Sequence, residues 1–99
     1  MLTEILAQNP DDAFARYGLA MEYSNAGDVD RALEEFQKLL AAHSEYTAGY
    51  FMAAQTLAKA KRIPEAKKML IDGMSSARRT GNAHALAEME GMLEELGQS

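Results

Sequence analysis

RYGLAMEY, residues 16–23, is the stretch that decides the fold, because its character returns 34 residues later in YFMAAQTL, residues 50–57. Alanine recurs at the same offset in three pairs, which are Ala20 with Ala54, Ala26 with Ala60, and Ala32 with Ala66. Large residues recur around them with changed identities: Tyr17 with Phe51, Tyr23 with Leu57, Val29 with Ile63, Phe36 with Leu70, and Leu40 with Met74. A fixed period of this length is typical of stacked helical repeats.

Outward from this stretch, the chain divides into helical segments with short turns between them, at about 2–8, 13–26, 29–43, 47–60, 63–79 and 83–96. Alanine, leucine, glutamate and methionine are among the commonest residues, and they favour helix. The breaks coincide with residues that start or stop helices, namely Pro10, Asp11–Asp12, Gly27–Asp28, Pro64 and Asn82. No run of Val, Ile or Thr alternates with polar residues, so we expect an all-α fold.

The first unit resembles the tetratricopeptide repeat, whose pattern is W-x2-L-G-x2-Y, then A-x3-F, then P. Leu19, Ala20 and Tyr23 match the first part of this pattern, and Ala32 and Phe36 match the second part. Arg16 stands where the pattern has tryptophan, and Ser44 stands where it has the final proline. The second unit matches the pattern more weakly, through Tyr50, Ala53, Ala54, Leu57, Ala66 and Leu70. A third unit matches only at its start, where Ala87 is in place.

The resemblance implies a single domain over residues 1–99, built of antiparallel helix-turn-helix repeats. Its parts would be a partial N-terminal helix at 1–9, repeats at 11–44 and 45–78, and a C-terminal capping helix at 82–97. Two antiparallel helices approach closely only where side chains are small, since a larger residue would overpack the contact. We therefore expect Ala20, Ala32, Ala54 and Ala66 at the helix crossings, and larger residues between the pairs: Tyr23, Phe36, Leu57 and Leu70.

In this family the first helix of each pair lines a concave face that holds a partner. By position, the resemblance implies a peptide-binding groove made of Phe14, Tyr17, Met21, Ser24, Asn25, Phe51, Gln55 and Lys59. An aromatic and methionine strip flanked by small polar residues suits an amphipathic helix or an extended apolar peptide. We therefore expect a non-catalytic module that binds a protein or peptide partner. The alternative is that terminal helices bury the strip.

Charge is banded along the chain, with a net charge of −6 over residues 1–58, +5 over residues 59–79 and −4 over residues 80–99. Oppositely charged bands could meet between copies. The rival function is therefore a self-assembling structural element that stacks head to tail through its terminal helices, as a homo-oligomer. The acidic total of −5 argues against nucleic acid as the main partner, although the basic band keeps that weaker hypothesis open.

Catalytic and metal-binding patterns are missing from the sequence. It has no cysteine, its two histidines (His43 and His84) lie far apart, and no spacing of a known catalytic or nucleotide-binding motif occurs. We therefore expect no enzymatic activity, no metal and no cofactor. Residues 1–10 lack the features of a signal peptide, and no apolar stretch approaches the ~18 residues of a membrane span. We expect a soluble, cytoplasmic protein with no membrane partner.

Overall fold

The computed structural model describes residues 2–97, and within this range every regular element is an α-helix. The helices are α1 (Leu2–Gln8), α2 (Ala13–Asn25), α3 (Val29–Ala42), α4 (Thr47–Lys59), α5 (Ile63–Thr80) and α6 (Ala83–Gly97). They coincide closely with the six segments expected from the sequence, so the prediction of an all-α fold is confirmed. Met1, which the expected partial N-terminal helix at 1–9 includes, lies outside the described residues.

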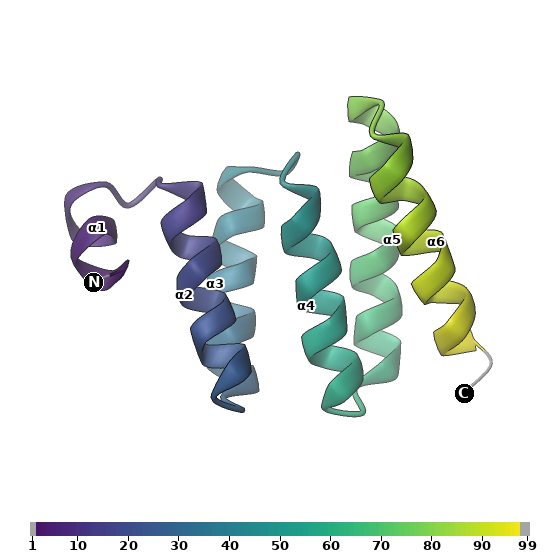
Figure 1. The fold of residues 1–99 in the computed structure, drawn as a ribbon, viewed down its shortest axis with the longest axis horizontal. Helices are drawn as coiled ribbons and strands as arrows, with labels where there is room; N and C mark the ends of the chain where they lie inside the picture. The colour runs from purple at the N-terminus through teal and green to yellow at the C-terminus, as the bar shows by residue number, and fades with distance from the viewer. Residues whose placement is uncertain (1, 98–99) are drawn as a thin grey trace.

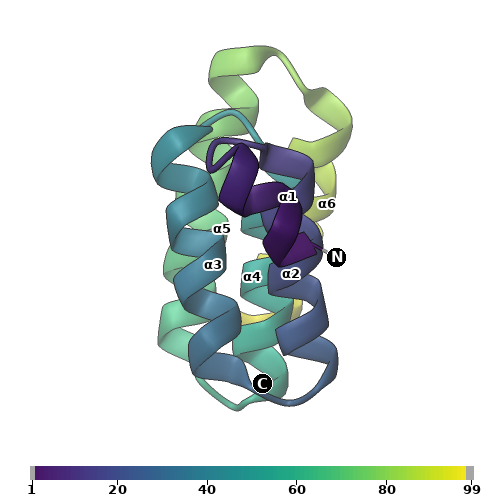
Figure 2. The same ribbon diagram turned by 90° about the vertical axis from the view of Figure 1, so that its left-hand side faces the viewer.

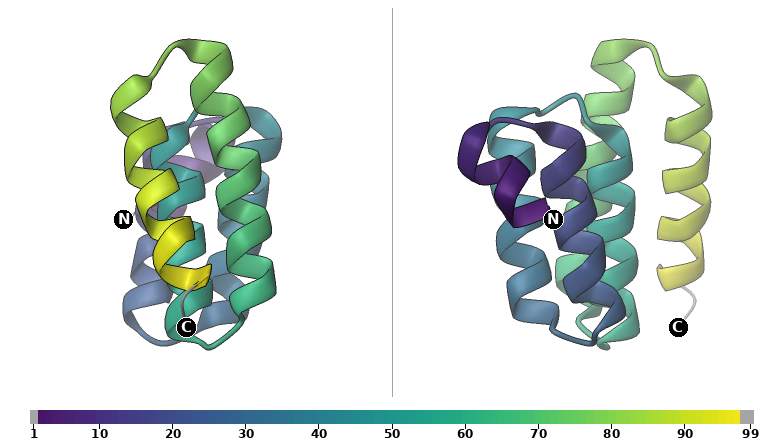
Figure 3. Two further views of the ribbon diagram at one scale, coloured as in Figure 1. Left: turned by 90° about the vertical axis from the view of Figure 1, so that its right-hand side faces the viewer. Right: turned by 60° about the vertical axis from the view of Figure 1, so that its left-hand side comes forward.

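The helices form two layers. Figure 1 shows α2, α4 and α6 in front and α3 and α5 behind them. Figure 2 shows the same division from the N-terminal end, where α1 lies against α2. The largest contacts join α2 to α3, α4 to α5, and α5 to α6, while α2 touches α4 and α4 touches α6 more sparsely. Figure 3 shows α6 running antiparallel beside α5 at the C-terminal end.

Buried alanines lie where the helices cross. Ala20, Ala32, Ala54 and Ala66 have no exposed surface. Ala20 of α2 and Ala32 of α3 share one apolar cluster with Ala53 of α4 and Phe36, so a single cluster joins the first helix pair to the second. Phe36, Leu57 and Leu70 fill the space between helices almost without exposure, and Tyr23 is half-buried. The packing expected from the repeat is therefore confirmed.

Helix ends follow the breaks in the sequence. Three helices are capped by a side-chain oxygen that accepts a backbone N–H: Asp12 from Ala15 (2.9 Å), Asp28 from Arg31 (3.3 Å), and Asn82 from Ala85 (3.0 Å). Gly27 and Gly81 have φ of +82° and +68°, the left-handed backbone that favours glycine after a helix. Lys61, one period after Gly27, takes the same kind of conformation (φ +66°) without being glycine.

The two departures from the repeat pattern make specific contacts. Arg16, at the tryptophan position, donates to Glu35 of α3 (2.5 Å) and to the Pro10 carbonyl (3.0 Å). Glu35 is 8% exposed, and a carboxylate so placed is tolerated because it is paired. The carbonyl of Ser44, at the proline position, accepts hydrogen bonds from the Tyr50 hydroxyl (2.9 Å) and the Ser76 hydroxyl (2.6 Å).

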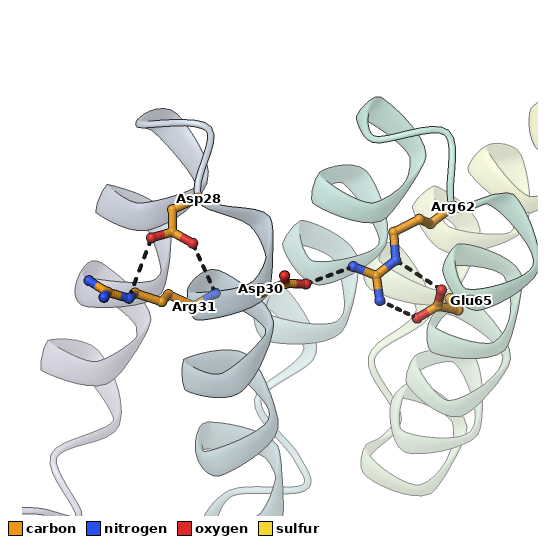
Figure 4. Close-up of polar contacts among 5 residues, drawn as sticks. All are labelled: Asp28, Asp30, Arg31, Arg62 and Glu65. Carbon is orange, nitrogen blue, oxygen red and sulfur yellow. Dashed lines mark hydrogen bonds and ion pairs between the residues drawn. The ribbon is translucent and has the colours of Figure 1, made fainter.

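A surface ion-pair network joins the start of α3 to the start of α5 (Figure 4). Arg62 donates to both carboxylate oxygens of Glu65, at 2.9 and 2.7 Å, and to Asp30 at 3.2 Å. Asp28 and Arg31 occupy the same two repeat positions as Arg62 and Glu65 with the charges exchanged, and they also pair (3.5 Å). The hydrogen bonds from Arg62 lower the pKa of the Glu65 carboxyl, and the bonds to Glu65 raise the pKa of Arg62.

Replacing Arg62 with methionine should raise the pKa of the Glu65 carboxyl toward its ordinary value, because the hydrogen bonds that favour the ionised form are lost. A 13C NMR titration of the Glu65 side chain measures this shift. The stability that the pair adds is present above the ordinary glutamate pKa and is lost as the pH falls through the lowered value. Arg31→Met is the control, since Arg31 pairs with Asp28. If Glu65 titrates alike in the parent and in Arg62→Met, the pairing is wrong.

Gly73 of α5 lies where α4, α5 and α6 come together. A Cβ atom added there would stand 2.5 Å from the Met89 sulfur and 2.6 Å from the Tyr50 Cβ. Both distances are shorter than real Cβ contacts, so a side chain at this position would force its neighbours to shift. Gly91 of α6 is the opposite case, because an added Cβ would meet nothing within 4 Å.

Gly73→Ala should therefore lower the free energy of unfolding by about 1–3 kcal/mol through overpacking. Gly91→Ala should raise it by about 0.5–1 kcal/mol, because alanine is the better helix former. Urea denaturation of the two variants and the parent measures both changes. Equal stabilities for the two variants would contradict the close approach of α6 to the α4–α5 pair.

Candidate functional site

The layer made of α2, α4 and α6 contains two adjoining hollows. The first, of about 340 Å3, has walls from all three helices, including Tyr17 of α2, Ala48 and Phe51 of α4, and Ala85 and Met89 of α6. The second, of about 310 Å3, continues between α4 and α6 and is lined by Phe51, Gln55, Ala87, Glu88, Gly91, Met92 and Glu95. Phe51 and Glu88 line both hollows, which together are called the groove below.

Three of the residues expected in a groove line this one: Tyr17 and Phe51 in the first hollow, and Phe51 and Gln55 in the second. Met21 is half-buried and packs against the cluster of Ala20, Ala32, Phe36 and Ala53. Phe14 of α2 is 76% exposed and lines neither hollow. Asn25 is also exposed, and it too lines neither hollow.

Ser24 and Lys59 lie elsewhere. They line a separate depression of about 190 Å3, together with Gly27, Val29, Thr56 and Ala60. The Ser24 hydroxyl also bonds to the Thr56 hydroxyl (2.8 Å), which joins α2 to α4. The structure therefore divides the eight expected residues among the groove, the core, the open surface and the separate depression that Ser24 and Lys59 line.

The terminal helices do not cover the strip in the way that the alternative interpretation requires. α6 supplies one wall of the groove, with residues from His84 to Glu95 along it. α1 packs against α2 through Leu6, which shares a cluster with Ala15 and Leu19. Tyr17 and Phe51 are both partly exposed, and both line the first hollow.

Tyr17 is held by two aromatic neighbours. Its ring centroid lies 6.4 Å from that of Phe36, edge to face, and 5.5 Å from that of Tyr46. Burial, and to a lesser degree the neighbouring Tyr46, raises the pKa of the Tyr17 hydroxyl. The hydroxyl therefore stays neutral at physiological pH, and Tyr17 offers a fixed ring with a polar tip.

Polar groups of the groove are concentrated on its α6 side. The Asn82 amide donates to the Thr47 hydroxyl (3.4 Å), and the His84 Nε2 lies 3.3 Å from a Glu88 carboxylate oxygen. These residues are absent from the groove expected from the sequence, because residues 82–97 were expected to form a cap. The repeat offset indicates part of this wall, since Ala48 and Phe51 correspond to Asn82 and Ala85 one period later, but it does not indicate His84 or Glu88.

The groove offers apolar and aromatic surface bordered by carboxylates, and such groups can bind a ligand through hydrophobic and charged contacts. Among residues 2–97, no group of three or more His, Cys, Asp and Glu side chains could hold a metal ion. No helix in this range is long and apolar enough to cross a membrane.

Comparison with known proteins gives consistent results. A sequence model of the tetratricopeptide repeat matches residues 23–89, and another of the same description matches residues 1–34. A TPR repeat-containing protein of Pseudomonas aeruginosa is 30% identical over 98 residues, which cover 99% of this chain and 93% of that protein.

Solved structures show the same fold. The tetratricopeptide repeat domain protein from Salinibacter ruber superposes with a TM-score of 0.81 at 26% identity and covers 89% of each chain. The type III secretion translocator chaperone SycD of Yersinia enterocolitica superposes with a TM-score of 0.85, over 98% of this chain and 68% of that chain. At 16% identity, the likeness to SycD shows the fold alone.

Proposed function

The chain belongs to the tetratricopeptide repeat family, and from this premise we propose that it is a non-catalytic interaction module whose groove binds a peptide or a helix of a partner protein. One observation carries the proposal. Two aromatic rings from different helices, Tyr17 and Phe51, stand partly exposed in a hollow of about 340 Å3 that α6 closes on one side. Aromatic side chains in a confined hollow are the usual anchors of protein interfaces.

The dimensions of the groove favour a segment of chain over a compact small molecule. The two hollows share Phe51 and Glu88 and continue along α4 and α6. Such an elongated site suits side chains projecting from one face of an extended strand or a helix. Phe14, 76% exposed and one turn before Tyr17 on α2, gives a bound segment a further apolar contact beyond the hollow.

The division into repeats at 11–44 and 45–78 with a capping helix at 82–97 stays a prediction, as do self-assembly and a cytoplasmic location. Ser24, Asn25 and Lys59 are not part of the groove as defined by the two hollows, so the proposal assigns them no contact with the bound segment.

Ala48→Gln tests the proposal by filling the first hollow. Ala48 is exposed and lines that hollow, so a longer side chain should block it while leaving the core intact. In affinity capture from a cell extract, proteins that depend on the groove should fall about tenfold or more with Ala48→Gln, a loss of roughly 1.4 kcal/mol.

Ala41→Gln is the matched control, since Ala41 is an exposed alanine of α3, outside the α2–α4–α6 layer. It should capture the same proteins as the parent. Circular dichroism should show all three proteins equally folded. If Ala48→Gln and the parent capture the same proteins in the same amounts, the groove is not the binding site.

A further inference from the structure

The groove has a one-sided charge. Glu88 and Glu95 of α6 are among its lining residues, and no lysine or arginine lines either hollow within the described residues. Its remaining lining residues are apolar, aromatic or polar, and the imidazole of His84 is the one basic group among them in this part of the chain. A bound segment therefore meets apolar surface and negative charge together.

Glu88 is the residue best placed to act on a bound segment. It lines both hollows, and its side chain is 53% exposed. Its contact with His84 is an ion pair only where the imidazole is protonated. A lysine or arginine on the bound segment would supply a permanent positive partner, whereas a carboxylate there would meet like charge.

The aromatic walls add a second reason to prefer a cation. Tyr17 and Phe51 line the same hollow as Glu88, and the face of an aromatic ring attracts an ammonium or guanidinium group. Lysine and arginine also carry apolar stems, which can lie along a hydrophobic wall while the charged head reaches a carboxylate.

The charge on the rest of the molecule reinforces this preference. The basic residues of α5, which include Lys67, Lys68, Arg78 and Arg79, belong to the other layer. Residues 80–99, which contain α6, carry four acidic residues and no lysine or arginine. An incoming basic segment is thus attracted toward the groove side and repelled from the α5 side.

From these observations we infer that the partner segment is basic. It places an aromatic or large aliphatic side chain in the first hollow, and a neighbouring lysine or arginine passes along the aromatic wall to the Glu88 carboxylate. The inference rests on the proposed function, because it names the chemistry of the segment that the groove would bind.

A random library of 12-residue peptides displayed on phage, selected against the parent chain and counter-screened on Ala48→Gln, tests this inference. Peptides whose binding is lost with Ala48→Gln should carry an aromatic or large aliphatic residue and at least one lysine or arginine within about four residues of it, one helical turn. Groove-dependent peptides that are acidic or uncharged would overturn the inference and leave the proposed function standing. If no selected peptide is sensitive to Ala48→Gln, the proposed function fails, and the inference fails with it.

Glu88→Gln and Glu90→Gln then separate a specific contact from general attraction to an acidic protein. Both substitutions remove one negative charge from α6, but Glu90 lines neither hollow. For a selected peptide, Glu88→Gln should raise the Kd by about three- to fivefold at low salt, and Glu90→Gln by less than about twofold. Equal effects of the two substitutions, or no effect of either, would overturn the assignment of Glu88.

Discussion

Close approach between helices at buried small residues is the constraint on which the rest of the structure depends. Ala20, Ala32, Ala54 and Ala66 have no exposed surface, and at Gly73 even a Cβ atom would collide with Met89 and Tyr50. These contacts pack the α3–α5 layer tightly against its neighbours. Helices of the same layer touch one another more sparsely than helices of opposite layers, so hollows remain along both layers. The groove along α2, α4 and α6 is one of them, and a hollow lined by Leu33 and Met69 between α3 and α5 is another.

The fold could be predicted from the sequence because its main signals are local or periodic. Caps such as Asp12 and Asn82 lie at the helix ends they specify, and the offset of 34 residues places the alanines. Contacts without a periodic counterpart could not be predicted. Gly73 corresponds to Leu39 one period earlier, so nothing in the repeat indicates that α6 requires glycine there. The same holds for Arg16, whose partner Glu35 lies on the next helix.

The candidate site was only partly predictable, for a geometric reason. Projecting a helix face gives the direction of a side chain, and three residues selected in this way, Tyr17, Phe51 and Gln55, line the groove. It does not show which other helix forms the opposite wall. It also does not show where along the layer a hollow begins and ends. For this reason Lys59 was expected in the groove, whereas it lines a different depression. The acidic wall forms because α6 occupies the place that the first helix of a third repeat would take. This role was not predicted, because residues 82–97 match the repeat pattern only weakly.

The most direct test of the central packing claim is a nuclear Overhauser experiment on protein with 13C-labelled alanine methyl groups. The structure places Ala20, Ala32 and Ala53, from three different helices, in one cluster with Phe36. We expect cross-peaks that connect these three methyl groups and the Phe36 ring in a single network. Methyl groups that show no cross-peaks to that ring, with chemical shifts typical of exposed alanine, would contradict it.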